Sequence, residues 1–336
     1  MSRKSPRFIP AGSTIEITAK TVASRFLLRP SPELNAAILA ILGRALSLFP
    51  VELHAFAFLS NHWHALVTVA DARAAKQFIQ HVHSTLATAV NRLTGWAGPV
   101  MQKAGIVVVS SDAEEARLRY VLAQGAKEGL VASPLEWPGA HCARALVGLE
   151  ELRGVWRDRT YEARLSTPRR GRQPVPAEVR TEYRIELAPL PSWRHLTVEE
   201  RQSRARELVA AIDADARERH PRPLGASAVC AQDPFERPSV IKRSPPPRIH
   251  TFSAETRAAF GAAYLTFRGE YAEARAMLRA GRLARLPAGC FPPVTPFRSE
   301  PSIVWTTLQP SRLRPQPDTP PRIEHEAFQW TNGALC

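Results

Sequence analysis

Alternation between apolar and polar residues marks several strands in the first part of the chain. "TIEITAKTVASRFLL" alternates and is rich in β-branched residues, which predicts a first strand. Two further strand-length runs, "VELHAFAFLS" and "HWHALVTV", are joined by Ser60 and Asn61, which predicts a hairpin with a tight turn. After a break at Gly95 to Gly98, "GIVVVSS" predicts a fourth strand.

Helical periodicity separates these strands. Ser31 stands before Pro32 and an apolar stripe, which predicts an N-cap and a helix that ends before Pro50. Apolar residues at helical spacing predict a second helix over about residues 72–93. A third helix, "DAEEARLRYVLAQGAKEGL", begins at Asp112, where a glutamate three residues later completes the spacing of a capping box.

The order of these elements is that of a ferredoxin-like α+β sandwich with an antiparallel sheet and an added C-terminal helix. Proline content then changes sharply, since 8 of the 30 prolines fall within residues 1–145 and 22 follow. We therefore predict one domain over residues 1–145 and a basic, proline-rich, mainly helical extension over residues 146–336.

Two stretches of the extension predict helices, "TVEERQSRARELVAAIDADARERH" and "SAETRAAFGAAYLTFRGEYAEARAMLRAGR". Two others, "KRSPPPR" and "LQPSRLRPQPDTPPR", predict extended segments. The second helix carries aromatic residues at helical spacing, which favours a packed core over a base-stacking surface: Phe260, Tyr264, Phe267 and Tyr271.

Composition adds a strong positive charge. The net charge is +14 and the pI is near 10.4, so the surface attracts polyanions, of which nucleic acid is the commonest. Ribosome-associated and membrane-surface proteins share this composition, so charge alone does not choose among them.

The cysteines and the apolar stretches bear on the compartment. The four cysteines lie far apart without a C-x-x-C pair, which argues against a disulfide framework or a cysteine zinc site and favours a reducing cytosol. The N-terminus lacks an apolar signal core, and the longest apolar stretch, residues 35–49, is too short to span a membrane. We expect a cytoplasmic protein with no membrane partner.

Two histidines interrupt the third predicted strand. Because residues i and i+2 of a strand point the same way, His62 and His64 share one face while Trp63 lies on the other. Both imidazoles can then converge on one metal ion; the alternative is two polar residues on a half-exposed sheet face. His81 and His83 have the same spacing in a helical pattern, where they diverge by roughly 200°, so we interpret them as helix-surface histidines.

The last predicted helix of the first domain presents a polar face. Tyr120 and Gln124 are spaced i, i+4 and lie one turn apart on that face, which Lys127 continues. A separate stripe is suited to burial: Leu118, Val121, Leu122 and Ala126. This leaves Tyr120 free to face the sheet, although a packing aromatic with its hydroxyl at the surface gives the same pattern.

Two blocks of the chain together resemble a known family. "SNHWHALVTV", followed later by "RLRYVLAQGAKEGLVASPLEWPG", is similar to the single-tyrosine HUH transposases and, within them, the REP-associated tyrosine transposases. The match to the strand motif rests on Asn61, His62 and His64. The match to the motif around the tyrosine rests on Tyr120, Val121, Gly129, Leu130, Val131, Pro134, Trp137 and Pro138. The resemblance covers about residues 8–140.

This resemblance implies an enzyme that cleaves and rejoins single-stranded hairpin DNA. Tyr120 would be the nucleophile and form a 5′-phosphotyrosine intermediate. A Mg²⁺ or Mn²⁺ ion would be bound by three ligands, His62, His64 and Gln124. Four basic residues would contact the DNA backbone if their segments face the DNA, and are solvated surface charge otherwise: Lys127, Arg119, Arg117 and Lys103. Such a transposase would act on the nucleoid in the cytoplasm, and the sequence allows a site within one chain or across a homodimer.

The chain departs from the family pattern in two places. It reads "GPVMQKAGIVVVS" where an aromatic and basic segment is usual, and it carries Gly125 inside an altered helix core. Because the nucleophile and ligand positions are intact, we expect an active enzyme. The alternatives are a domesticated or inactive relative that binds hairpin DNA without cutting it, and a metal-dependent hydrolase that merely shares the strand motif. The extension is either an accessory DNA-binding module or a segment whose charge only aids solvation.

Overall fold

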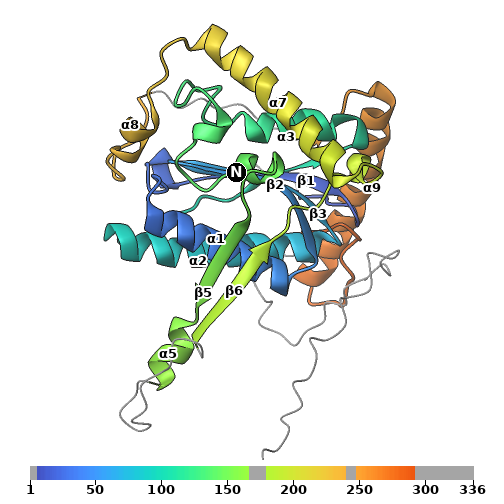
Figure 1. Ribbon diagram of the computed structural model, residues 1–336. Helices are drawn as coiled ribbons and strands as arrows, with labels where there is room; N and C mark the ends of the chain where they lie inside the picture. The colour runs from blue at the N-terminus through green and yellow to red at the C-terminus, as the bar shows by residue number, and fades with distance from the viewer. Residues whose placement is uncertain (1–5, 166–178, 240–246, 292–336) are drawn as a thin grey trace, which may run out of the picture.

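The computed structural model describes residues 6–165, 179–239 and 247–291. Within these residues the chain forms a mixed α+β fold around a five-stranded, mainly antiparallel sheet with the order β2-β3-β1-β4-β7 (Figure 1). The predicted α+β class with an antiparallel sheet is confirmed. The strands are β1 (Thr14–Lys20), β2 (Val51–Leu59), β3 (His62–Val69), β4 (Gly105–Val109) and β7 (Ile249–His250).

The predicted hairpin forms one side of the sheet. β2 and β3 pair antiparallel on either side of Ser60 and Asn61. β1 lies against the other side of β3, with Thr18 opposite His64. Since side chains alternate between the two faces of a strand, this register places polar residues of β1 next to the histidines of β3.

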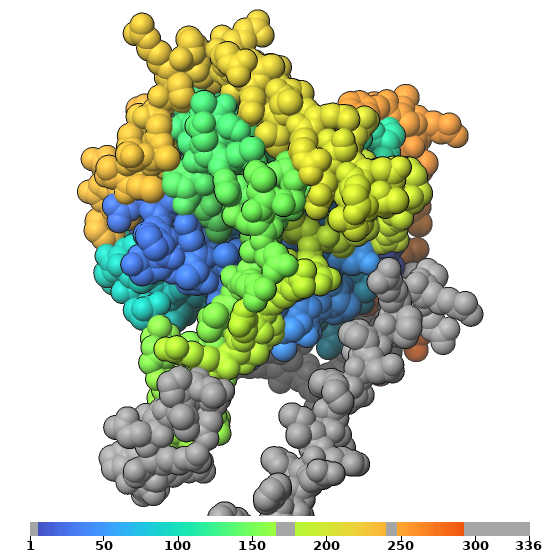
Figure 2. Space-filling model, in the orientation of Figure 1, coloured from blue at the N-terminus to red at the C-terminus, as the bar shows by residue number. Residues whose placement is uncertain are grey.

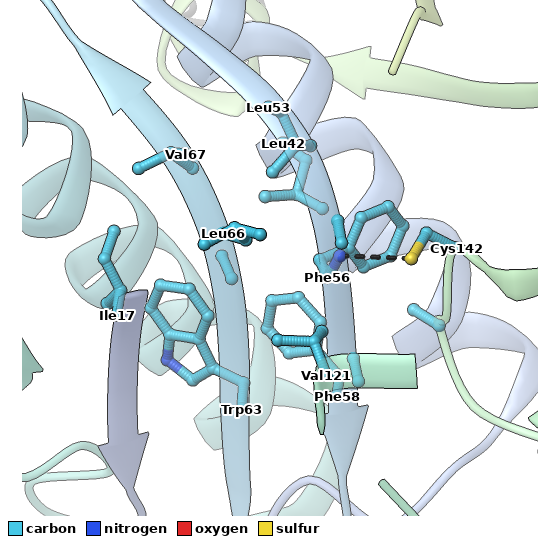
Figure 3. Packing of buried hydrophobic residues seen from close by; sticks show 14 of the residues in the cluster. Ile17, Leu42, Leu53, Phe56, Phe58, Trp63, Leu66, Val67, Val121 and Cys142 are labelled. Carbon is cyan, nitrogen blue, oxygen red and sulfur yellow. Dashed lines mark hydrogen bonds between the residues drawn. The ribbon is translucent and has the colours of Figure 1, made fainter. Parts of the chain in front are cut away.

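Two helices cover one face of the sheet (Figure 1): α1 (Pro32–Leu48) and α2 (Ala72–Thr94). Trp63 is fully buried in this layer, and its ring centroid lies 5.3 Å from that of Phe58 and 5.7 Å from that of His83 on α2. Figure 3 shows Phe56 and Leu42 in the same packed cluster. This layer holds the hairpin rigidly, so the opposite face of β3 has a fixed backbone on which to carry functional groups.

Local sequence sets where these helices begin. The Ser31 hydroxyl accepts a hydrogen bond from Leu34 N at 3.2 Å, with Pro32 in the first turn, so α1 starts as predicted. Asp71 caps α2 in the same way, by accepting from Ala74 N at 2.7 Å.

The start of the third helix differs from the prediction. α3 (Glu114–Leu122) follows a turn of 3-10 helix, and Asp112 does not cap it. The Asp112 carboxylate instead accepts hydrogen bonds from Thr251 Oγ1 and from the backbone N–H groups of Phe252 and Ser253. The predicted capping box is wrong because these donors, which come from a distant part of the sequence, hold Asp112 away from the first turn of α3.

α3 lies on the face of the sheet opposite to α1 and α2, and α7 (Val198–Arg219) packs against it (Figure 1). α7 is the first helix predicted for the extension. A capping box between Thr197 and Glu200 fixes its start. Its apolar side, including Leu208 and Ile212, is buried.

A separate two-stranded ribbon lies across α1 (Figures 1 and 2). It consists of β5 (Leu152–Arg157) and β6 (Arg180–Ile185), and α5 (Arg159–Leu165) lies at its far end. The approach to α1 requires glycine, because a Cβ at Gly154 would come within 2.5 Å of the backbone of Leu39. The two strands depart from the expectation of a mainly helical extension.

α9 (Ala254–Arg279) is the second helix predicted for the extension. Tyr264 and Phe267 are buried, and the Phe267 ring centroid lies 4.7 Å from that of Phe8. The aromatic residues of α9 therefore form a core, as predicted. The described residues also form two short helices, α4 (Ala143–Leu146) and α8 (Ala226–Cys230). Of the two predicted extended segments, 308–322 and most of 242–248 lie outside the described residues.

Side chains from both sides of Leu146 contribute to one hydrophobic cluster. The division into a domain over residues 1–145 and an extension over residues 146–336 concerns which parts fold independently, and it stays a prediction. Contributions from beyond the predicted boundary include Leu152, Ile185, Leu190, Trp193, Leu208 and Ile212.

The histidines of α2, His81 and His83, are half-buried and not fully exposed as expected. The His81 ring centroid lies 5.8 Å from that of Phe49, and His83 packs edge-on against Trp63. Burial lowers the pKa of His83 to about 4. Aromatic side chains from outside the helix cover both rings, which helical spacing alone does not reveal.

Two further observations concern the described residues. Their helices include none that is long and apolar enough to cross a membrane. Their three cysteines are free thiols: Cys142, Cys230 and Cys290.

Candidate active site

His62 and His64 lie side by side on the face of β3 that α3 covers. Their ring centroids are 5.1 Å apart, and His64 is only 3% exposed. Burial and, to a lesser extent, the neighbouring His64 lower the pKa of His62 to about 3, against the opposing effect of the Gln124 side chain. Burial also lowers the pKa of His64, against the opposing effect of Glu16. Both rings are therefore neutral near pH 7, the form that binds metal ions.

Protein groups hold the Nδ1 atom of each ring. His62 Nδ1 lies 2.6 Å from Asn61 Oδ1. His64 Nδ1 lies 3.0 Å from Thr18 Oγ1 and 3.2 Å from Glu16 Oε1. These contacts fix both rings and leave Nε2 as the nitrogen of each that can bind an external ligand.

α3 places Tyr120 beside this pair, within the same chain. The Tyr120 ring centroid lies 5.5 Å from that of His64, in an edge-on arrangement. Two cations lie over the phenol ring: Arg117 Cζ is 3.9 Å and Lys127 Nζ 3.6 Å from its centroid. The predicted apolar stripe docks the helix and leaves Tyr120 half-buried; its residues are Leu118, Val121, Leu122 and Ala126.

Gln124 lies in the turn after α3. The helix ends at Leu122, earlier than predicted, and Gly125 then adopts a left-handed φ of 89° that favours glycine. The Gln124 side chain is fully buried, and its Nε2 donates to the Tyr120 carbonyl at 2.8 Å. Its Oε1 is buried without a hydrogen-bond partner, an arrangement that costs about 1–3 kcal/mol unless a ligand satisfies the oxygen.

These residues fit a divalent cation. The described part of the chain contains no group of three or more His, Cys, Asp or Glu side chains that could hold a metal ion. His62 and His64 supply two neutral nitrogens and Gln124 supplies the unpaired oxygen. Mixed nitrogen and oxygen donors suit Mg²⁺ less well than Mn²⁺, and both accept an amide oxygen.

Glu16 is the residue of this site that sequence reasoning misses. It projects from β1 and is 4% exposed, and its contacts include His64, Arg117 Nη2 at 2.5 Å and His250 Nε2 at 3.3 Å. Burial alone would raise the pKa of Glu16, but its contacts with His250 and His64 and the charge of Arg117 outweigh that effect and hold the pKa well below its usual range. The available signal is an acidic residue between the isoleucines of the strand "TIEITAK".

The basic residues proposed to contact DNA are placed differently from one another. Arg117 and Lys127 flank Tyr120, whereas Arg119 makes an ion pair with Asp215 of α7 at 2.5 Å. Lys103 is exposed in the segment before β4. A pocket of about 260 Å³ opens between α3 and α7; its lining includes Arg117, Arg119, Tyr120, Lys127, Asp215 and Arg219.

Comparison with known proteins shows a distant similarity to a solved structure. Neither a family model nor a curated protein matches the chain. A solved structure of a REP-associated tyrosine transposase bound to a REP hairpin is similar to part of it, with 19% sequence identity and a TM-score of 0.34. The match covers 45% of this chain and 88% of that one. At this level, the similarity does not establish a family for the chain.

Proposed function

We propose that this protein is a metal-dependent DNA strand transferase that uses Tyr120 as its nucleophile. The observation that carries the proposal is the convergence of four side chains in one chain, with the Tyr120 ring 5.5 Å from that of His64. The other two are His62, whose ring centroid lies 5.1 Å from that of His64, and Gln124, whose side chain donates a hydrogen bond to the Tyr120 carbonyl. We also propose that β1 to β4 with α1 and α2 form a ferredoxin-like sandwich, which the strand order β2-β3-β1-β4 supports.

His62, His64 and Gln124 are the residues that would hold the ion. When bound, Mg²⁺ or Mn²⁺ would polarise the scissile phosphate and offset its negative charge. The protein contributes rings locked by Asn61 and Glu16, neutral imidazoles, and an amide oxygen that is already desolvated. Little reorganisation is then needed on binding, which is the advantage of a preorganised site.

Tyr120 would attack the phosphorus atom of a phosphodiester. A bond forms between the phenol oxygen and phosphorus, and the bond from phosphorus to the 3′ oxygen breaks. The phenol loses its proton and the departing 3′ oxygen gains one, so a 5′-phosphotyrosine and a free 3′-hydroxyl result. Arg117 and Lys127 hold the ring from two sides and add positive charge where phosphate oxygens would lie.

The substrate we propose is single-stranded DNA that carries a hairpin. The net charge of +14 favours a polyanion, and a flexible single strand can reach a half-buried phenol more easily than a rigid duplex can. Attack by a different 3′-hydroxyl on the phosphotyrosine would rejoin strands without an external energy source, because the phosphodiester energy is kept in the covalent intermediate.

A second candidate is a protein that binds hairpin DNA without cutting it. The observation that favours it is the small pocket beside Tyr120, about 260 Å³, which α7 closes on one side through the ion pair between Arg119 and Asp215. This volume lies below the range of about 300–1,000 Å³ that is usual for ligand pockets, so cutting requires the DNA to displace or skirt α7.

One assay separates these candidates. The purified chain is incubated with Mn²⁺ and a set of single-stranded hairpin oligonucleotides, and the products are resolved in SDS. We expect a DNA-protein adduct that survives denaturation. Binding without an adduct would favour the second candidate, and cleavage without an adduct would indicate a metal-dependent hydrolase.

His64→Ala is expected to lower the adduct rate at least about 100-fold, because it removes a ligand and the ring packed on Tyr120. DNA affinity, measured by fluorescence anisotropy, should stay close to that of the unchanged chain. His83→Ala is the matched control, since His83 packs against Trp63 on the other face of β3. Undiminished adduct formation in His64→Ala would contradict the ligand assignment.

A further inference from the structure

One carboxylate connects the histidine pair to the tyrosine. Glu16 Oε1 lies 3.2 Å from His64 Nδ1, and Glu16 Oε2 lies 2.5 Å from Arg117 Nη2. Arg117 in turn lies over the Tyr120 ring, with Cζ 3.9 Å from the centroid. The two oxygens of a single side chain therefore face two different parts of the site.

We propose that Glu16 is a positioning residue, which orients His64 for metal binding and holds Arg117, and through it Tyr120, in place beside His64. This inference rests on the proposed function for the role of the metal and of Tyr120. It assigns to β1 a part in the site that neither the histidine motif nor the tyrosine motif includes.

The first half of this role follows from the chemistry of imidazole. A histidine that binds a metal through Nε2 usually donates its Nδ1 proton to a carboxylate or a carbonyl oxygen, which fixes the tautomer and makes the ring a stronger ligand. Glu16 meets this requirement for His64, and Thr18 adds a second contact at 3.0 Å. Both partners come from β1, whose register places Thr18 opposite His64.

The second half follows from the flexibility of arginine. An arginine side chain loses rotamer entropy when it is held over a ring, and Arg117 is held there by an ion pair in which its side chain is 17% and that of Glu16 is 4% exposed. At this depth water screens the pair weakly. Loss of the carboxylate would release the Arg117 guanidinium, and the Tyr120 ring would lose its packing contact with that group.

A third contact joins Glu16 to the predicted extension. His250 of β7 approaches Glu16 Oε2 at 3.3 Å, and β7 extends the sheet next to β4. Glu16 is thus surrounded by groups from β3, α3 and β7. Its position is determined by the assembled sheet rather than by its own strand.

Glu114 offers a matched comparison. It is as buried as Glu16, at 3% exposed. It contacts the same face of the sheet, where its carboxylate accepts a hydrogen bond from Thr14 Oγ1 at 3.1 Å. Its other oxygen accepts from Ser192 N at 2.9 Å. Among the contacts of the described residues, none joins Glu114 to His64 or Arg117, so its removal tests burial of a carboxylate without the positioning role.

The experiment compares Glu16→Gln with Glu114→Gln in the full chain. Isothermal titration with Mn²⁺ alone should show affinity weakened about 10- to 100-fold in Glu16→Gln and little changed in Glu114→Gln. At Mn²⁺ concentrations that saturate each chain, the adduct rate of Glu16→Gln should stay below that of the unchanged chain, because released Arg117 no longer fixes Tyr120. A purely structural role would weaken both variants alike.

A second variant separates the two halves and guards against misfolding. Arg117→Gln leaves the contact between Glu16 and His64 in place, so Mn²⁺ affinity should hold while the saturated adduct rate falls. If Glu16→Gln fails to melt cooperatively, the test rests on Arg117→Gln. An unchanged adduct rate at saturating Mn²⁺ in that variant would overturn the inference.

The outcomes distinguish this inference from the proposed function. Equal Mn²⁺ affinity in Glu16→Gln and the unchanged chain, with adduct formation intact in the latter, overturns the role of Glu16 alone. Mn²⁺ binding that depends on Glu16, without any adduct in the unchanged chain, overturns strand transfer and supports the metal-orienting role. No Mn²⁺ binding by the unchanged chain overturns both.

Discussion

The Tyr120→Phe chain is expected to form no detectable SDS-stable adduct with hairpin DNA, while binding that DNA as the unchanged chain does. The substitution removes only the phenol oxygen, which is the atom that would bond to phosphorus. The aromatic ring stays between Arg117 and Lys127 and beside His64. Because phenylalanine also makes cation–π contacts, the free energy of unfolding should change by less than about 1 kcal/mol.

Tyr161→Phe serves as the control for this experiment. Tyr161 is 43% exposed on α5, at the far end of the ribbon, so its hydroxyl should not affect the adduct. Denaturing gels measure the adduct, fluorescence anisotropy the DNA affinity and circular dichroism the melting temperature. Persistence of the adduct in Tyr120→Phe would mean that another side chain, or water, attacks the phosphate.

A fragment of residues 1–145 is expected to lose cooperative folding. The fragment lacks core side chains against which its own buried residues pack. They are Leu152, Ile185, Leu190, Trp193, Leu208 and Ile212. At about 1.5–3 kcal/mol for each buried large side chain, their loss forfeits on the order of 10 kcal/mol. That is comparable with the whole stability of a typical domain, about 5–15 kcal/mol.

Thermal melting followed by near- and far-ultraviolet circular dichroism checks this expectation. The full chain should melt in one cooperative transition, and the fragment should show helical signal without fixed aromatic packing. A fragment that melts cooperatively within about 5 °C of the full chain would show that residues 1–145 are an independent domain, and that the later elements only decorate it.

Local patterns revealed the strands and helices that bear the site. The hairpin is predictable because Ser60 and Asn61 separate two runs with period-two alternation, and that period puts His62 and His64 on one face. The first helix is predictable because Ser31 and Pro32 mark its start. These signals depend only on neighbours in the sequence.

Contacts between distant segments were not predictable in the same way. Asp112 has the spacing of a helix cap, yet it binds the backbone before α9, because tertiary donors compete with local ones. Glu16 gains its partners from β3, α3 and β7, and no single segment indicates that they meet. Gly154 likewise shows its purpose only once the ribbon lies on α1.

The decisive measurement is tandem mass spectrometry of the adduct formed by the unchanged chain. Trypsin cleaves after Arg119 and Lys127, so the peptide Tyr120–Lys127 should carry nucleotides joined to Tyr120 through a 5′ phosphate, and only when Mn²⁺ and both histidines are present. Nucleotides on any other peptide, or cleaved DNA with no peptide attached, would contradict a site built from Tyr120, His62 and His64.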